Sequence, residues 1–353
     1  MTTVKNSAGR FHVAWTGDFK ADDGSPRFRE RGVDVFAAYP HIEQSMFDEH
    51  RPVIGADQIG SAQGVIVLTP RVTAASLAAS GDLLAIGRFG VGYDNVDVEA
   101  CTSADVVAFI TAGSVDRSVA EATIGWMLAL THHLRTKDAL VRTGRWNDRS
   151  AYMGSELRDR TLGVVGLGGI GRKLVELLAG FGMNQPLAFD PLVNPAMAAS
   201  LGVRLVELDE LMAAADFVSI HCPLNHQTRG LVGRRQLGRM KSDAWLINTA
   251  RGGIVDEQAL YEVLRDRRIA GAAIDCFEGE PLTAPHRFAE FDHVLLAPHS
   301  IAWTHELFRD NGRAVCQGMV DLSLGRRPRG VLNPQVFDRP GLVRKWERLR
   351  VQL

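Results

Sequence analysis

The chain has 353 residues, with 40 basic and 41 acidic side chains and a net charge of −1. This length suits two domains, each large enough to bury its own core, and the balanced charge argues against a nucleic-acid-binding surface. Four scattered cysteines without a C-x-x-C pair argue against a zinc site or a disulfide framework.

The first ten residues, "MTTVKNSAGR", lack the apolar core of a signal peptide. No stretch contains the roughly 18 apolar residues that a membrane helix requires. We therefore expect a cytoplasmic protein whose partner is a small molecule, with no nucleic acid, no membrane and no metal involved.

The first hundred residues hold five strand candidates separated by turn residues, namely "FHVAWTG", "VDVFAAY", "GVIVLT", "LLAIGRFG" and "DVVAFIT". They predict a small α/β unit. A boundary is expected near residues 112–118, where turn residues gather in "TAGSVDRS". Ser118 and Glu121 then stand at capping-box spacing before apolar residues at helical period, which predicts one long helix over residues 118–144.

From about residue 160 onward, short β-rich apolar runs alternate with helical patterns, which is typical of βαβ units and a parallel sheet. The strands expected here are "TLGVVG", "PLAFD", "DFVSIH", "AWLINT", "AGAAID" and "HVLLAPH", with a weaker one at "VRLVE". A helix is expected to begin after Asp256 as its N-cap. The fold class is therefore α/β, with a doubly wound parallel sheet in the second part of the chain.

A glycine motif follows the first of these strands. Gly166, Gly168 and Gly171 have G-x-G-x-x-G spacing between an apolar strand and a helix, where glycines allow a tight turn and a close approach to a pyrophosphate. A glycine-rich turn without a ligand is the alternative. Asp190 ends the next strand, where an acid hydrogen-bonds the adenosine ribose and repels a 2′-phosphate, so NAD is favoured over NADP.

Several later strands end in polar residues, and ligands of an open parallel sheet bind outside the carboxyl ends of its strands. Singly, each residue has an ordinary explanation: Arg251 as a surface charge, Asp275 as a helix or turn cap, and His299 as a side chain facing water. Convergence with the glycine loop favours a shared ligand site. The residues are His221, Thr249, Arg251, Asp275 and His299.

Three of the polar residues have complementary chemistry. A carboxylate such as Glu280 orients an imidazole and favours its protonated form, while an arginine such as Arg251 grips a planar carboxylate through two hydrogen bonds. Hydride arriving at a carbonyl carbon builds charge on the oxygen, and the imidazolium of His299 can deliver a proton there. This set suits a dehydrogenase acting on a 2-oxo acid.

The chain resembles the D-isomer-specific 2-hydroxyacid dehydrogenases over nearly its whole length. The resemblance rests on "IGRFGVGYDNVDVEAC", "GVVGLGGIGRKL", "HCPLNHQTRGLV", "INTARGGIVDEQAL", "AIDCFEGEP" and "LAPHSIAWT", in the family's order. It implies Arg251 as carboxylate and carbonyl binder, Glu280 as partner acid and His299 as proton donor and acceptor. It also implies that NAD is the cofactor and that the substrate is a small 2-oxo or 2-hydroxy acid.

The resemblance also assigns binding roles to a larger set of residues. The cofactor set adds the glycine loop, the strand ends and the nicotinamide surroundings, with Asp275 on the carboxamide: Gly166, Gly168, Gly169, Ile170, Gly171, Asp190, His221, Cys222, Pro223, Thr249, Ala250, Arg251, Asp275, His299, Ala302 and Thr111. The substrate set is Arg88, Val91, Gly92, Arg251 and His299.

The family arrangement implies that a Rossmann-type NAD domain, residues 113–302, is inserted into a flavodoxin-like substrate domain formed by residues 1–112 and 303–353. It further implies a homodimer formed through the NAD domains. Ile110, Ala112 and Ala302 depart from the family's usual pattern, which affects packing around the nicotinamide. We also expect Cys276 to be a buried apolar filler.

The leading interpretation is NAD-dependent interconversion of a D-2-hydroxy acid and its 2-oxo acid, most simply reduction of glyoxylate or hydroxypyruvate. Two alternatives stay open. One is 3-phosphoglycerate oxidation, in which Arg88 serves a phosphate. The other is an NAD-sensing, corepressor-like binding protein, although the joint presence of the arginine, glutamate and histidine argues against pure sensing.

Overall fold

The computed structural model describes residues 10–78 and 81–350, and the chain divides into two compact units. The first unit comprises Met1–Val115 and Thr304–Leu353, and the second Asp116–Trp303. Residues 1–9, on which the expectation about a signal peptide rests, lie outside the described residues. In the part of the chain that is described, no helix is both long and apolar enough to cross a membrane.

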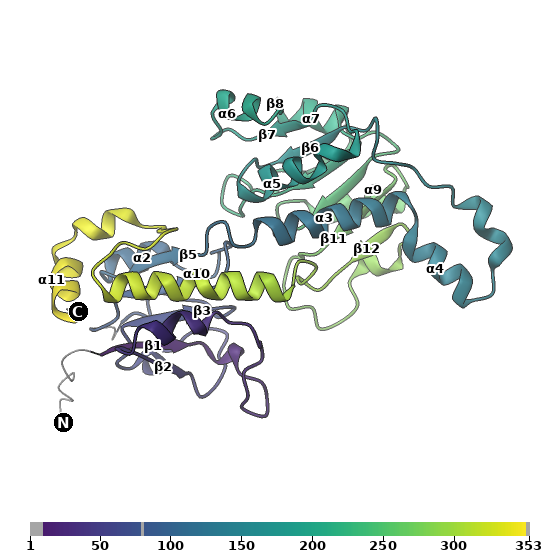
Figure 1. The fold of residues 1–353 in the computed structure, drawn as a ribbon. Coiled ribbons are helices and arrows are strands. Elements are labelled where there is room, and N and C mark those ends of the chain that lie inside the picture. The colour runs from purple at the N-terminus through teal and green to yellow at the C-terminus, as the bar shows by residue number, and fades with distance from the viewer. Residues whose placement is uncertain (1–9, 79–80, 351–353) are drawn as a thin grey trace. The chain divides into compact units, whose positions relative to one another are not determined.

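The first unit is built on a five-stranded parallel sheet in the order β2-β1-β3-β4-β5 (Figure 1). Its strands are β1 (Phe11–Trp15), β2 (Ile42–Met46), β3 (Gly64–Val67), β4 (Ala85–Arg88) and β5 (Val107–Ile110). Its helices are η1 (Gly17–Phe19), η2 (Val33–Ala38), α1 (Ala56–Ile59), α2 (Val98–Ser103), α10 (His305–Ser323), η6 (Pro334–Asp338) and α11 (Pro340–Leu349). This strand order is the flavodoxin-like one.

Helix α10 returns from the far end of the sequence to pack on this sheet. A Cβ at Gly87 of β4 would lie 2.7 Å from Cγ2 of Val315, so the absence of a side chain there permits the close contact. Residues separated by more than 200 positions therefore share one core.

The second unit is built on a seven-stranded parallel sheet in the order β12-β11-β10-β9-β6-β7-β8. Its strands are β6 (Leu162–Val165), β7 (Leu187–Phe189), β8 (Arg204–Leu205), β9 (Phe217–Ile220), β10 (Trp245–Asn248), β11 (Gly271–Ile274) and β12 (Val294–Leu296). Its helices are α3 (Asp116–Thr131), α4 (Leu134–Arg142), η3 (Trp146–Ala151), α5 (Gly169–Leu178), η4 (Ala179–Phe181), α6 (Pro195–Ser200), α7 (Leu208–Ala214), α8 (Arg234–Leu237), α9 (Glu257–Arg265) and η5 (Arg287–Glu290).

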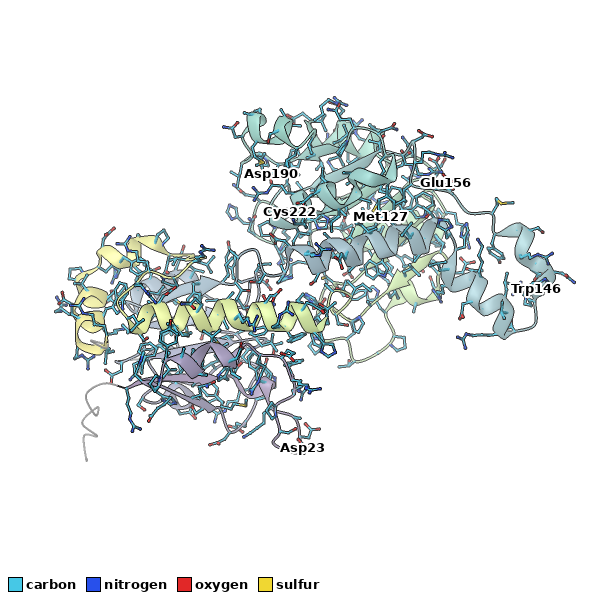
Figure 2. The ribbon with its side chains drawn as sticks, viewed as in Figure 1. Asp23, Met127, Trp146, Glu156, Asp190 and Cys222 are labelled. Atoms are coloured by element: carbon cyan, nitrogen blue, oxygen red, sulfur yellow. The ribbon has the colours of Figure 1, made fainter. Side chains whose placement is uncertain are left out.

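Helices cover both faces of this second sheet. One apolar cluster contains buried residues of α7, α8 and α9, such as Leu211, Leu237 and Leu260. The other contains buried residues of α3 and α5, such as Met127, which Figure 2 labels, and Leu174. Two helical layers on an all-parallel sheet confirm the predicted doubly wound α/β class.

One predicted element of the first unit is wrong, and one strand was missed. Val33–Ala38 forms the 3₁₀ helix η2 in place of a strand, because Gly32 turns the chain at φ +67°, where a Cβ would lie 2.1 Å from the amide nitrogen of Arg313. Strand β2 was not predicted at all. Its sequence, "IEQSM", has one buried residue, Ile42, so this edge strand lacks a hydrophobic signal.

The single helix predicted over residues 118–144 is also wrong. His133 adopts a left-handed conformation with φ 55°, which ends α3 at Thr131 and starts α4 at Leu134. The capping box is absent as well, because α3 begins at Asp116 and Glu121 pairs with Arg117 on the same helix. In contrast, Asp256 caps α9 as predicted, with its carboxylate accepting the amide of Ala259.

The C-terminal helix α11 is tied to the rest of the first unit by half-buried polar contacts. Lys345 Nζ donates to the carbonyl oxygens of Leu83, Ala104 and Asp105 at 2.9, 3.3 and 3.0 Å. The indole of Trp346 donates to the carbonyl of Leu322 at 2.7 Å. Burial lowers the pKa of Lys345, and the three carbonyl acceptors compensate for its lost hydration. The tail thus has a structural role that its sequence did not reveal.

Candidate active site

The glycine turn between β6 and α5 is shaped by backbone crowding. Gly166 has φ +97°, and a Cβ there would lie 2.6 Å from the amide nitrogen of Cys222. A Cβ at Gly171 would lie 2.5 Å from the carbonyl oxygen of Gly166. Gly168, by contrast, is exposed, with open space where its Cβ would stand. The turn therefore leaves the N-terminus of α5 accessible, which suits an anionic ligand.

Asp190 stands directly after β7, and its carboxylate accepts backbone amides on both sides, one of them from the glycine turn. Its Oδ2 accepts the amide of Leu167 at 2.9 Å, and its Oδ1 accepts the amide of Leu192 at the same distance. Figure 2 labels Asp190 and Cys222 on the second unit. The carboxylate therefore stabilises the turn, and its role toward a ribose stays a prediction.

His221 and Cys222 follow β9, beside β6, where the strand order of the sheet reverses. His221 Nε2 lies 2.8 Å from the hydroxyl of Ser219, while its buried Nδ1 has no partner among the described residues. Burial lowers the pKa of His221 to about 4 and raises the pKa of the Cys222 thiol to about 11. Both side chains are neutral near pH 7, so neither suits proton transfer or nucleophilic attack. Pro223 follows them directly.

The loop after β10 places Arg251, and the preceding Asn248 holds that loop in shape. Asn248 Nδ2 donates to the carbonyl of Arg251 at 3.0 Å, and its Oδ1 accepts the amide of Ala250 at 3.1 Å. The hydroxyl of Thr249 is buried without a partner among the described residues. Sequence reasoning missed Asn248, although its position as the last residue of β10 was a usable signal.

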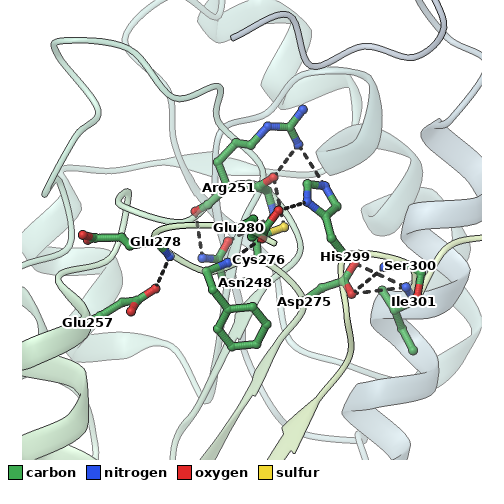
Figure 3. Close-up of polar contacts among 12 residues, drawn as sticks. Asn248, Arg251, Glu257, Asp275, Cys276, Glu278, Glu280, His299, Ser300 and Ile301 are labelled. Carbon is green, nitrogen blue, oxygen red and sulfur yellow. Dashed lines mark hydrogen bonds and ion pairs between the residues drawn. The ribbon is translucent and has the colours of Figure 1, made fainter. Parts of the chain in front are cut away.

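Asp275 positions the turn that carries His299. Its Oδ1 accepts the amides of Ser300 and Ile301 at 2.9 and 3.2 Å, and its own carbonyl accepts the His299 amide at 2.8 Å (Figure 3). His299 itself has φ 51°, a left-handed conformation that such bonds must stabilise. Asp275 is thus a turn cap, one of its two expected explanations. A contact with nicotinamide stays a prediction.

Arg251, His299 and Glu280 form a continuous polar chain in the second unit (Figure 3). His299 Nδ1 lies 2.6 Å from Glu280 Oε2, and His299 Nε2 lies 3.4 Å from Arg251 Nη1. The amide of Phe277 donates to the other carboxylate oxygen of Glu280 at 2.7 Å. The side chain of His299 is 40% exposed, so part of the imidazole is accessible to a ligand.

The electrostatics of this chain favour an ionised carboxylate. Burial opposes ionisation of Glu280, but the hydrogen bond and charge of His299, the Phe277 amide and the charge of Arg251 outweigh it and lower the pKa of Glu280. The ionised carboxylate therefore orients the ring through Nδ1, while Arg251 Nη1 faces Nε2.

Cys276 is buried beside this chain, as expected for a filler. Its thiol lies 3.3 Å from the carbonyl oxygen of Ala250. The ligand atoms of Cys276, Glu280 and His299 lie within 4.8 Å of one another. The guanidinium of Arg251 stands at the same place and opposes a cation by its charge.

Several predicted ligand residues belong to the first unit. Arg88 ends β4, and its guanidinium donates to the carbonyl of Phe89. Val91 and Gly92 follow in a half-buried loop. The hydroxyl of Thr111 donates to Asn311 of α10 at 2.6 Å. In the second unit, Gly169 and Ile170 open α5, while Ala302 is buried.

A doubly wound sheet with an open glycine turn at its switch point defines a dinucleotide-binding protein. Residues 124–300 match the family model described as D-isomer specific 2-hydroxyacid dehydrogenase, NAD binding domain. The chain is 34% identical over 314 residues to a glyoxylate reductase from Korarchaeum cryptofilum, covering 87% of this chain and 94% of that protein. The protein therefore belongs to the D-isomer specific 2-hydroxyacid dehydrogenase family.

Two further comparisons fit this assignment. A D-3-phosphoglycerate dehydrogenase from Archaeoglobus fulgidus is 37% identical over 263 residues, which cover 74% of this chain and 50% of that protein. The chain thus spans about half the length of the curated phosphoglycerate dehydrogenases it matches. A crystal structure of a protein from Thermus thermophilus has a TM-score of 0.78 and 26% identity, covering 91% of this chain and all of that one.

Proposed function

We propose that the protein is an NAD-dependent oxidoreductase that interconverts a D-2-hydroxy acid and its 2-oxo acid. The observation that carries this proposal is the Arg251–His299–Glu280 chain, with its 3.4 Å and 2.6 Å contacts. It combines a planar cation for a carboxylate with a proton donor whose charge is balanced from behind. We infer a small substrate of the glyoxylate or hydroxypyruvate type.

The residues of the second unit fit a dinucleotide. The open space at Gly168 and the amides at the start of α5 suit a diphosphate, and the buried Nδ1 of His221 and hydroxyl of Thr249 leave two hydrogen-bonding atoms for a ligand. Asp190 repels a 2′-phosphate, so NAD is preferred to NADP. When bound, NAD supplies or accepts the hydride.

The residues of the polar chain divide the remaining work. Arg251 binds the substrate carboxylate and polarises the adjacent carbonyl. His299 Nε2 gives its proton to the oxygen as charge develops there, and it takes the proton back in the oxidative direction. Glu280 stays ionised and stabilises the imidazolium, while Asp275 and Asn248 hold the two loops in register. Arg88, Val91 and Gly92 are proposed to bind the substrate carboxylate from the first unit.

We further infer a cytoplasmic homodimer. Segment 134–153, which contains α4 and η3, carries exposed apolar side chains at one end of the second unit (Figure 2). Leu134, Val141, Trp146 and Met153 are 52, 64, 62 and 81% exposed. Such a patch is costly in a monomer and suits a subunit contact. The inserted NAD domain, residues 113–302, would then carry the dimer interface, with the substrate domain formed by residues 1–112 and 303–353.

The alternative function, 3-phosphoglycerate oxidation, has one argument in its support: the sequence similarity to a phosphoglycerate dehydrogenase extends over 74% of this chain. A screen of NADH oxidation against glyoxylate, hydroxypyruvate, pyruvate, phenylpyruvate and 3-phosphohydroxypyruvate separates the two. Preference for one of the small unphosphorylated acids is the expected result. Preference for 3-phosphohydroxypyruvate would favour the alternative, and NADH binding without any turnover would favour a sensor.

A further inference from the structure

Asp116, the first residue of α3, places a carboxylate against the glycine turn that begins α5. A Cβ at Gly169 would lie 2.1 Å from Asp116 Oδ2 and 2.7 Å from Oδ1, so glycine at position 169 leaves room for this acid. Helices α3 and α5 pack against each other. The carboxylate of Asp116 therefore lies at the N-terminus of α5, where the proposed function also places the diphosphate of the cofactor.

The carboxylate is half-buried and makes no hydrogen bond or ion pair with the described residues. The cations that face it, Arg172 and Lys173 of α5, are engaged elsewhere. Arg172 Nε donates to the carbonyl of Gly168 at 3.1 Å, and Lys173 Nζ pairs with Glu176 at 2.6 Å. On its own helix, Arg117 is paired with Glu121. The charge of Asp116 is thus offset only at a distance.

We propose that Asp116 controls cofactor affinity by competing with the diphosphate of NAD(H) for the N-terminus of α5, so that the cofactor binds more tightly as the pH falls. This inference rests on the proposed function. Two anions at one helix end repel each other, and a bound diphosphate favours protonation of the carboxylate. Cofactor binding should therefore take up protons.

The direction of the pH effect follows from linkage. Burial raises the pKa of free Asp116, against the opposing charges of Arg172 and Lys173. A neighbouring diphosphate raises this pKa further. Affinity is therefore lowest above the pKa of Asp116 in the complex, rises as the pH falls through that value, and levels off below the pKa of the free protein.

The test measures binding of NADH, ADP-ribose and adenosine to the full chain between pH 5.5 and 8.5, with Asp116→Asn as the variant. At pH 8 we expect Asp116→Asn to bind NADH and ADP-ribose about five- to fiftyfold more tightly, with a flattened pH dependence. Adenosine lacks the diphosphate, so its affinity should not change. Glu121→Gln, which removes a charge from an exposed site on the same helix, should match the wild type.

Calorimetry in buffers of different ionisation enthalpy should show proton uptake with NADH for the wild type and little for Asp116→Asn. If Asp116→Asn melts at a much lower temperature, Asp116→Ser replaces it, because serine also suits a helix start. Equal or weaker NADH binding by a folded variant would overturn the inference. Failure of the wild type to bind NADH at all would instead contradict the proposed function.

Discussion

The two parallel sheets carry different residues at the point where their strand order reverses. In the first unit, the carboxylate of Asp18 closes the ends of β1 and β3, because it accepts the hydroxyl of Thr16 at 2.6 Å and the amide and hydroxyl of Thr69 at 2.8 and 2.5 Å. In the second unit, the corresponding position after β6 holds Gly166 and the exposed Gly168. The two switch points therefore differ in residue chemistry, because a carboxylate bridges the strand ends in the first and glycine leaves open space in the second.

This difference explains where the reactive side chains stand. The second sheet leaves the Nδ1 of His221 and the hydroxyl of Thr249 without partners among the described residues, and it exposes His299. Asp18 satisfies the polar groups at the ends of β1 and β3 in the first unit, although the buried Nδ1 of His41 there also has no partner among the described residues. Buried polar atoms without partners are costly, and a ligand at the strand ends of the second sheet would satisfy the two that stand there.

The largest expected effect is on His299, the centre of the second sheet's polar chain. His299→Ala should lower kcat for 2-oxo acid reduction by about 10²–10⁴, because the proton donor is lost. Steady-state NADH oxidation measures it. His50→Ala, an exposed histidine of the first unit, is the control. Full activity of His299→Ala would show that His299 is not the proton donor.

Arg251→Lys should lower kcat/KM by about 10- to 100-fold, because a point charge replaces a planar, two-pronged donor worth about 1.5–3 kcal/mol. Cofactor titration and thermal melting should stay close to the wild type, since two hydrogen bonds of Asn248 hold the loop in addition to the one that Arg251 Nη1 donates to the carbonyl of Ala250. An unchanged KM together with full turnover would contradict the proposed carboxylate contact.

Cofactor preference tests the role of Asp190. We expect kcat/KM to be at least about tenfold higher with NADH than with NADPH, because the carboxylate repels a 2′-phosphate. The carboxylate of Asp190 also accepts the amides of Leu167 and Leu192. Asp190→Asn keeps one of the two acceptor oxygens, so it should disturb the turn less than Asp190→Ala. Equal use of both cofactors by the wild type would leave Asp190 as a turn-forming residue alone.

Glu280→Gln should shift the pH dependence of kcat/KM while leaving much of the rate at the optimal pH. The lowered pKa of Glu280 means that it is ionised throughout the neutral range, and its Oε2 lies 2.6 Å from Nδ1 of His299. Without this charge, the alkaline limb of reduction and the acidic limb of oxidation should both move to lower pH, by about one unit. Profiles of kcat/KM against pH in both directions check this, with a deuterated hydride donor to show that chemistry limits the rate. Unmoved limbs would mean that Glu280 only orients the ring.

The sequence predicted those parts of the molecule that depend on hydrophobic runs and on strand ends. All seven strands of the second sheet were found, and the signal is strongest for β6, β9, β10 and β11, which are buried along their whole length and largely apolar. It also brought Arg251, Glu280 and His299 into one site, as the 3.4 and 2.6 Å contacts show.

The failures depend on single backbone conformations and on tertiary contacts. The left-handed His133 divides a helix whose apolar period looks continuous, and the exposed β2 has no alternation to detect. Asp116 looked like a turn residue, since only the folded chain brings it to Gly169. Such features need the structure, because no local pattern encodes which carboxylate meets which turn.

The smallest effect on activity is expected at Lys345, in the first unit. Lys345→Met removes the ammonium that three carbonyl oxygens share while keeping much of the apolar stem. Leaving those buried acceptors without a donor should lower the free energy of unfolding by about 1–3 kcal/mol, with kcat and KM unchanged. Urea unfolding beside steady-state kinetics measures both, and Lys137→Met, a half-buried lysine of α4, is the control. A large change in kcat at unchanged stability would show that α11 affects the reaction. The distinction between a first unit with a structural role at this helix and a second unit that carries the reactive residues would then no longer hold.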